Sequence, residues 1–214
     1  MAVNDNIIAE MAGLTVDGDE KEPHHGVTVS EEMAGVYVFR FHHEIDLEDA
    51  LEMSPCTFGN HLLLFDRFGN HGSPSDVPLH HVQLWVQIYG LPSGFHSDAV
   101  LKRLNDSLGE FIKADANNFA RGWNSYMRIR IKKDVRTAIV TGTWIRQEKG
   151  AWSSITFQYE NLPNFCYVCG FLGHTKRFCP EQLNRKDKPV VCRYGPELHA
   201  TKRRVQNNIE AQWL

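Results

Sequence analysis

The chain has 214 residues, of which 42% are hydrophobic and 23% charged, a balance typical of a globular protein with one or two domains. Its net charge of −3 hides a gradient: residues 1–35 hold eight acidic side chains and one basic, residues 36–159 hold thirteen of each, and residues 160–214 hold five acidic and nine basic. No stretch approaches the ~20 apolar residues of a membrane-spanning helix, and no secretory signal is visible. We therefore expect an intracellular protein, nuclear or cytoplasmic, without membrane contact.

The first 34 residues are acidic and poor in aromatic side chains, which predicts a disordered segment. A folded body begins near residue 35. Apolar spacing predicts, in chain order, a strand over 36–41, a helix over 46–53, strands over 61–67 and 82–89, a helix after the N-cap Ser97, and strands over 111–114, 126–132, 138–144 and 154–159. This order predicts an α+β domain over residues 35–160, with a mainly antiparallel sheet and two helices, partly like an RNA-recognition motif.

The predicted strand over 126–132 has an unusual polar face. Tyr126, Arg128, Arg130 and Lys132 alternate with apolar residues, so they share one side of the strand. A basic row led by an aromatic ring can track a phosphate backbone, which makes Arg128 and Arg130 candidate nucleic-acid contacts. The alternative is a solvated outer face with interspersed arginines, and ordinary surface composition favours it.

Four residues near the C-terminus carry the most specific signal. Cys166, Cys169, His174 and Cys179 follow the pattern C-x2-C-x4-H-x4-C. Three thiolates and one imidazole complete a tetrahedral zinc site without a position for water, so the ion would be structural. A redox pair or two disulfides are the alternatives, but the five cysteines are odd in number and no secretory signal is visible. We predict one structural Zn²⁺ within residues 163–181, followed by a basic, polar tail over 182–214.

This segment resembles the zinc knuckle of retroviral-type nucleocapsids. Tyr167, Gly170, Gly173, Lys176 and Arg177 stand at that family's aromatic, glycine and basic positions. Knuckles bind single-stranded nucleic acid by splaying and stacking its bases. The resemblance makes Lys176 and Arg177 candidate phosphate contacts.

The aromatic residues of the segment divide into two groups. Tyr167 is the first candidate for stacking and Phe171 the second, with stacking worth about 1–3 kcal/mol per base. Alternatively, either ring only covers the metal or attaches the segment to the body. Phe165 and Phe178 adjoin ligands, and we expect both to be packing residues.

No catalytic constellation accompanies these features. The histidine pairs 42–43 and 80–81 invite a hydrolase interpretation, but adjacent residues on a strand point to opposite faces, so neither pair is expected to converge on one ion. No nucleophile motif or phosphate loop is present. Cys192 and His199 lack neighbouring ligands. We therefore expect no enzymatic activity.

Residues from about 35 to 180 together resemble a plant family of retrotransposon-derived proteins. Its members carry an N-terminal domain of unknown function before a knuckle, often upstream of LINE-type endonuclease and reverse-transcriptase segments. The matching landmarks are Asp46-Leu47-Glu48, Asn60-His61-Leu62-Leu63, Leu84-Trp85-Val86-Gln87, Leu91-Pro92, Gly109-Glu110-Phe111, Met127-Arg128-Ile129-Arg130 and Leu162-Pro163.

The chain also departs from that family. A strand and a helix usually precede the strand over 36–41, Cys56 replaces a tryptophan, and the motif at 194–200 has lost its tryptophan and arginine. The resemblance implies a copy truncated at its N-terminus.

The combined interpretation is a zinc-dependent protein that binds RNA or single-stranded DNA, with self-association as a further option. The tail residues Arg185, Lys186 and Lys188 would add phosphate contacts. The alternative is a protein-interaction module that uses the knuckle or the sheet as its docking surface.

Overall fold

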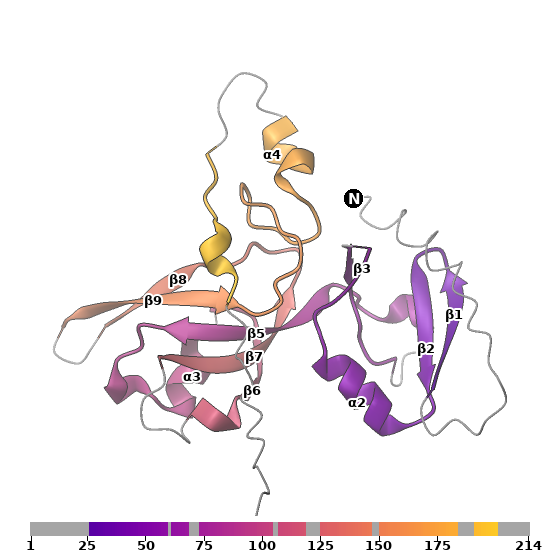
Figure 1. The fold of residues 1–214 in the computed structure, drawn as a ribbon, viewed down its shortest axis with the longest axis horizontal. Coiled ribbons are helices and arrows are strands. Elements are labelled where there is room, and N and C mark those ends of the chain that lie inside the picture. Colours follow the sequence, from indigo (N-terminus) through magenta and orange to yellow (C-terminus); the bar gives the residue numbers. More distant parts are fainter. Residues whose placement is uncertain are drawn as a thin grey trace, which may run out of the picture.

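The computed structural model describes residues 26–59, 61–68, 73–104, 107–118, 125–146, 150–183 and 191–200. They form a small N-terminal unit, residues 26–68, beside a five-stranded antiparallel sheet on which the C-terminal segments pack (Figure 1). The protein is therefore of the α+β class, as the sequence predicts. Within these residues, no helix has the length and apolar character needed to cross a membrane.

The N-terminal unit consists of two hairpins and one helix. Its elements are β1 (Val27–Met33), β2 (Val36–Phe41), α2 (Glu44–Glu52), β3 (Cys56–Phe58) and β4 (His61–Leu63). The expectation of disorder is wrong for β1, because its alternating valines pair antiparallel with β2 across a turn at Gly35, where φ is +83°. Residues 1–25 lie outside the described part.

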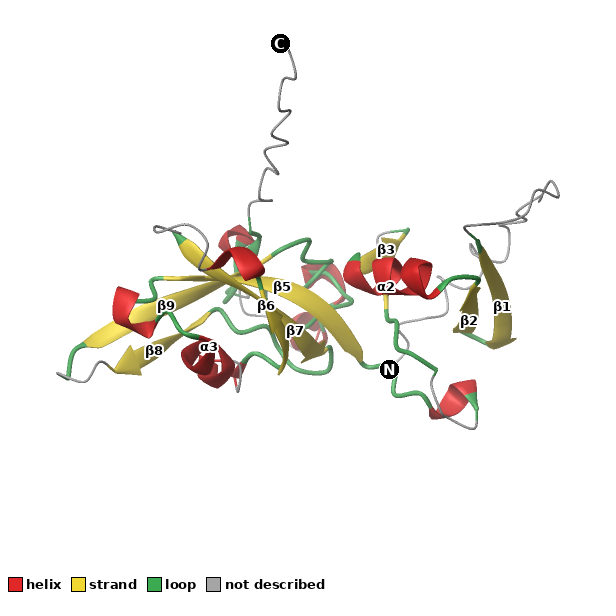
Figure 2. Cartoon of the chain, turned by 90° about the horizontal axis from the view of Figure 1, so that it is seen from below, coloured by secondary structure: helices red, strands yellow, loops and turns green. Residues whose placement is uncertain are grey.

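The larger sheet has the strand order β6-β7-β5-β9-β8, with every pair antiparallel. Its strands are β5 (His81–Tyr89), β6 (Glu110–Ala114), β7 (Tyr126–Asp134), β8 (Gly142–Arg146) and β9 (Trp152–Tyr159). The alternation predicted for β5 is confirmed, since Val82, Leu84 and Val86 are at most 3% exposed. Leucines of α3 (Asp98–Leu104) join these residues in one apolar core, with α3 packed against the sheet (Figure 2).

Short helical segments complete the fold. They are the 3₁₀ turns η1 (Pro74–Asp76), η2 (Ser93–Phe95), η4 (Ala116–Asn118), η5 (Lys176–Phe178) and η6 (Pro196–Leu198), with a one-turn helix α4 (Pro180–Leu183). The described part therefore holds three α-helices where the sequence predicts two. The predicted N-cap at Ser97 is present, since its Oγ accepts the amide of Val100 at 3.4 Å.

Two predicted strands are misplaced. The strand expected over 61–67 ends at Leu63, and the strand expected over 138–144 begins only at Gly142. In the second case the amide of Ile139 donates to the carbonyl of Gly170 instead of to a neighbouring strand. A contact with a residue some thirty positions further along the chain leaves no trace in the local apolar pattern. The likeness to an RNA-recognition motif stays a prediction.

The N-terminal unit is thinly packed. Among residues 26–59 and 61–68, only Pro55 is buried, and every fully buried apolar side chain of the described chain lies beyond residue 80. A cavity of about 420 Å³, lined by apolar side chains such as Phe39, Leu47 and Leu64, opens between β2, α2 and β4. The unit therefore depends on contacts with the larger sheet for much of its stability.

Candidate metal centre

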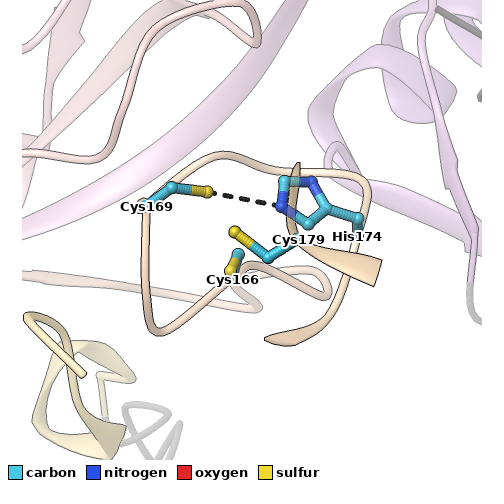
Figure 3. Close-up of side chains that lie close together, drawn as sticks. All are labelled: Cys166, Cys169, His174 and Cys179. Atoms are coloured by element: carbon cyan, nitrogen blue, oxygen red, sulfur yellow. Dashed lines mark hydrogen bonds between the residues drawn. The ribbon is translucent and has the colours of Figure 1, made fainter. Parts of the chain in front are cut away.

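The four predicted ligands converge in space. One ligand atom from each of Cys166, Cys169, His174 and Cys179 lies within 4.8 Å of the other three, and the three cysteines are buried (Figure 3). The Sγ of Cys169 is 3.3 Å from Nε2 of His174. Three sulfurs and a ring nitrogen at this separation match the donor set of a closed tetrahedral zinc site. These residues would hold the ion, which would supply folding free energy and no chemistry at a substrate.

Backbone geometry explains why the chain can wrap such a centre. Gly170 and Gly173 adopt φ values of +78° and +87°, a region that glycine enters without a steric penalty. These turns allow the amide of Gly170 to donate to the carbonyl of Cys166 at 2.8 Å and the amide of Gly173 to donate to the carbonyl of Asn164 at 3.0 Å.

Burial favours the neutral forms of two of the four ligands. Burial raises the pKa of Cys169 to about 12, and the neighbouring sulfurs of Cys166 and Cys179 act in the same direction. Burial lowers the pKa of His174, which favours the neutral imidazole that a metal needs. A divalent ion among these atoms would provide the positive charge that deprotonates coordinating thiols.

Comparison with known proteins agrees with this geometry. Residues 127–181 match the zinc knuckle family. The chain carries a zinc knuckle. It is also 24% identical over 139 residues to an uncharacterized protein of Arabidopsis thaliana, in a match that covers 64% of this chain and 43% of that protein. The chain thus spans less than half the length of this relative. No solved structure matches it.

The knuckle is fixed to the sheet rather than suspended from it. Phe165 and Leu172, which are at most 7% exposed, belong to the same apolar core as the strands. The Gly170 carbonyl accepts the amide of Ile139 at 2.9 Å, just before β8. The prediction that Phe165 packs is therefore confirmed.

Part of the predicted polar tail holds the knuckle from the other side. The amides of Arg193 and Tyr194 both donate to the carbonyl of Tyr167, and the amide of Ala200 donates to the carbonyl of Tyr159 in β9. Leu198 between them is 2% exposed. We call residues 191–200 the strap. No periodicity in the sequence indicates that they pack, and residues 184–190, with Arg185, Lys186 and Lys188, lie outside the described part.

The knuckle presents a cluster of basic and aromatic side chains to solvent. Lys176 and Arg177 are exposed on η5, and Phe178 beside them is 66% exposed. The prediction that Phe178 packs is wrong, because the turn that brings Cys179 to the metal directs this ring outward. Phe171 is 37% exposed. Tyr167 is half-buried, with its ring edge-on to Phe165 at 4.8 Å, a contact in keeping with the packing alternative.

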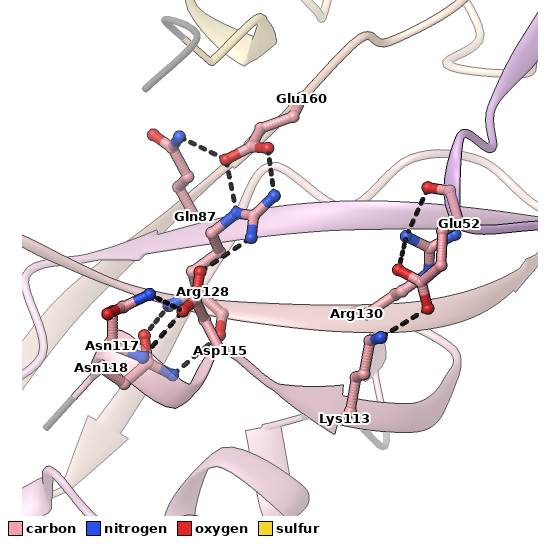
Figure 4. A network of polar contacts seen from close by, with 9 residues as sticks. All are labelled: Glu52, Gln87, Lys113, Asp115, Asn117, Asn118, Arg128, Arg130 and Glu160. Carbon is pink, nitrogen blue, oxygen red and sulfur yellow. Dashed lines mark hydrogen bonds and ion pairs between the residues drawn. The ribbon is translucent and has the colours of Figure 1, made fainter. Parts of the chain in front are cut away.

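Arg128 lies in an internal polar network instead of on a free surface. Its guanidinium pairs with Asp115 and Glu160 at 2.8 Å each (Figure 4). It also stacks 3.6 Å above the ring centre of Trp85. Glu160 also accepts from the amide of Gln87 at 2.7 Å. Two carboxylates within the domain therefore balance the positive charge of Arg128, so this side chain has little charge and few free donors left to attract a phosphate.

Arg130 is wholly buried. It donates to Gln83 Oε1 at 2.9 Å and to the carbonyls of Leu51 and Glu52 at 2.6 and 2.9 Å. A phosphate cannot reach a side chain that is 0% exposed, so we remove Arg130 from the candidate nucleic-acid contacts. The alternation placed both arginines on one face correctly, but α2 and its following loop cover the part of that face where Arg130 lies.

His80 and His81 converge, contrary to the prediction. Their ring centres are 4.3 Å apart, and both rings lie close to Asp134. β5 begins only at His81, so the alternation of a regular strand does not extend to His80. Sequence patterns also gave no sign of two exposed tryptophans: Trp144 and Trp152 are 64% and 62% exposed on the β8–β9 hairpin. Unusually high exposure of tryptophan can be recognised only in the structure.

Proposed function

We propose that this protein is a zinc-dependent binder of single-stranded nucleic acid, RNA or DNA. The observation that carries the proposal is the exposed group formed by Phe171, Lys176, Arg177 and Phe178 on the knuckle, here called the contact group. Aromatic rings stack on bases while neighbouring cations contact phosphates, which is the combination that single-strand binders use. Tyr167, with less of its ring available, is a secondary stacking candidate.

Zinc would govern this surface through the fold of the knuckle. All four residues of the contact group lie between or next to metal ligands, in a segment built of turns, one β-bridge and the 3₁₀ turn η5. A short chain of this kind takes its fold from the metal, so removal of zinc should dissolve the arrangement of rings and cations together. Zinc would therefore act on affinity without touching the nucleic acid.

The cationic part of the proposal is tested with a matched pair of variants. Lys176→Gln/Arg177→Gln removes two charges from the contact group, and Lys102→Gln/Arg103→Gln removes the same two charge types from exposed positions on α3. Binding of a single-stranded RNA is titrated at several salt concentrations. The knuckle variant should reduce the salt slope by about 0.7 for each phosphate that it no longer neutralises, and the α3 variant should leave the slope unchanged. Equal effects of the two variants would contradict a localised site.

The aromatic part requires a second pair. Phe178→Ala should weaken RNA binding by about 1–3 kcal/mol, the value of one stacked base. Phe68→Ala removes another exposed ring, 41% accessible, from the N-terminal unit, and should have no effect on affinity. Zinc content measured on both variants separates loss of stacking from loss of the site. Unchanged affinity for Phe178→Ala and for Phe171→Ala, with normal zinc, would leave the proposal without its aromatic component.

The likeness of residues 35–180 to retrotransposon-derived plant proteins supports a finer proposal. The chain would derive from such an element and act on its transcript as a packaging or positioning factor, without enzymatic activity. Immunoprecipitation from the source tissue followed by RNA sequencing tests this point. Enrichment of element transcripts is expected, and an RNA population that mirrors the input would contradict it.

A protein-interaction module remains the second candidate, and one observation favours it. Trp144 and Trp152 lie on adjacent strands, where the register places both side chains on the same face, and each is more than 60% exposed. Exposed aromatic pairs are common anchors of protein interfaces. If Trp144→Ala and Trp152→Ala abolish self-association seen by sedimentation and leave RNA affinity intact, this surface serves a protein partner. If they weaken RNA binding, it extends the nucleic-acid surface.

A further inference from the structure

A second cluster of metal-ligating side chains lies on the larger sheet, outside the knuckle. One ligand atom each from His80, His81 and Asp134 falls within 4.8 Å of the other two, and all three side chains are half-buried. His81 opens β5 and is directly opposite Asp134, the last residue of β7. The carbonyl of His80 accepts the amide of Val135 at 2.9 Å, which fixes the backbone on both sides of the cluster.

A second observation points to a ligand at this cluster. The Nδ1 atom of His81 is buried and has no hydrogen-bond partner among the described residues. A buried polar atom without a partner costs about 1–3 kcal/mol, so such atoms usually bind water, an ion or another group. Here the atom belongs to a residue whose neighbours are an imidazole and a carboxylate, the side chains that borderline divalent metals prefer.

We propose that His80, His81 and Asp134 form a second metal site, which binds a divalent transition-metal ion such as Zn²⁺. Two imidazole nitrogens and one carboxylate oxygen provide three ligands and leave at least one coordination position for water or an exogenous group. This donor set differs from the closed, sulfur-rich knuckle, where the protein supplies all four ligands. The second ion would be the exchangeable one.

Arg136 provides an internal test of the site. Its side chain, 65% exposed, donates to both oxygens of Asp134, from Nε at 3.0 and 3.2 Å and from a terminal nitrogen at 2.7 Å. The backbone amide of Arg136 also donates to Oδ1 of Asp134 at 2.9 Å, so Arg136 makes four contacts with the carboxylate. A carboxylate has about four lone-pair positions, so a metal ion would have to replace one of these contacts. The guanidinium also places a positive charge beside the proposed cation. Its removal should therefore tighten metal binding, the opposite of what removal of a ligand does.

The position of the site suggests its consequence for the fold. The ion would join the beginning of β5 to the end of β7. The same ends of these strands meet the N-terminal unit, where Lys132 of β7 pairs with Asp66 at 2.8 Å. Metal binding would thus stabilise the region where the two parts of the protein are in contact.

The experiment counts metal ions on the full chain. Protein with zinc already in the knuckle is dialysed against Zn²⁺ at micromolar concentration, and bound metal is measured by mass spectrometry. We expect two ions per chain for the unaltered protein and for His96→Ala, a control that removes an exposed histidine elsewhere. We expect one ion for His81→Ala and for Asp134→Asn, with affinity for the second ion lower by at least about tenfold. Arg136→Gln should bind it several-fold more tightly.

Absorption spectra with Co²⁺ distinguish the two sites and show whether a variant is misfolded. Co²⁺ in the knuckle gives intense thiolate charge-transfer absorption, whereas Co²⁺ bound by two histidines and one aspartate gives only weak visible bands. The thiolate bands of His81→Ala and Asp134→Asn report whether each variant still folds around its knuckle. A single ion on the unaltered protein, or a second ion that His81→Ala and Asp134→Asn both retain, would overturn the proposal. Neither result affects the function assigned to the knuckle.

Discussion

Arg130 should be the main polar link between α2 and the larger sheet. No basic residue lies in the last turn of α2, so its final carbonyls lack a cation from their own helix. Arg130, reaching across from β7, donates to the carbonyls of Leu51 and Glu52 and lies 3.3 Å from the Glu52 carboxylate. A buried guanidinium there satisfies acceptors that the end of a helix leaves free and complements its dipole.

The loss of stability expected on substituting Arg130 follows from these contacts. Arg130 makes three short hydrogen bonds to neutral acceptors, and each bond to a charged group is worth about 1.5–3 kcal/mol net. The substitution Arg130→Met also removes the cost of burying a charge, which offsets part of this sum. The Glu52 carboxylate is half exposed and still pairs with Lys113, so the substitution leaves no unpaired buried charge. We expect a net loss of about 3–5 kcal/mol from the hydrogen bonds, centred on the N-terminal unit because it has little core of its own.

Amide hydrogen exchange shows which part of the protein loses stability in Arg130→Met. In the unaltered protein, amides of residues 35–59 and 61–68 should already exchange faster than those of β5, β7 and β9, because the N-terminal unit is thinly packed. In Arg130→Met, a loss of about 3 kcal/mol would speed exchange in α2 by about a hundredfold. Arg146→Met, which alters an exposed arginine on β8, is the matched control. Exchange in α2 that stays as slow as in the control would refute the reasoning.

Three further predictions concern the sheet and the strap. Tyr159→Phe removes the buried bond from the Tyr159 hydroxyl to the Val140 carbonyl at 2.8 Å and should lower the unfolding free energy by about 1–3 kcal/mol in urea denaturation. Gly170→Ala should free the strap, because the new methyl group would overlap the ring of Tyr194 and the backbone φ of +78° is strained for alanine. Amide hydrogen exchange at Tyr194 should become faster, and unchanged exchange would contradict this prediction. Burial opposes ionisation of Asp115, but hydrogen bonds from neighbouring donors lower its pKa. The Asp115 carboxylate therefore contributes fully to the unfolding free energy above the usual pKa of 3.8, and this contribution is lost as pH falls through the folded-state pKa. Asp115→Asn should flatten that part of the curve of unfolding free energy against pH.

The metal ligands could be predicted from sequence because their determinants are local. Cys166 and Cys179 are thirteen positions apart, and the glycines between them fix the turns, so the spacing alone determines which atoms can meet. The core face of β5 was equally predictable, since alternation over nine residues leaves one register that buries Leu84 and its neighbours. Short-range patterns thus led to the correct fold class and metal centre.

The errors share a physical cause, which is dependence on contacts distant in sequence. The alternation in β7 placed Arg128 and Arg130 on one face but carried no information about what covers that face. Residues 51 and 52 cover Arg130, almost eighty positions away. Similarly, the strap has no periodicity because Leu198 is buried by the knuckle and β9 together. The rule for alternate residues failed at His80 because it holds only inside a strand.

Attachment of the knuckle to the sheet has a consequence for binding. A knuckle on a free linker must lose orientational freedom when it engages a strand of nucleic acid, and that loss reduces affinity. Here the carbonyls of Tyr167 and Gly170, both within the knuckle, accept amides from the strap and from the segment before β8. These bonds fix the direction of the contact group before any ligand arrives. Variants that loosen the strap should therefore weaken nucleic-acid binding even though they leave the metal ligands and the contact group unchanged.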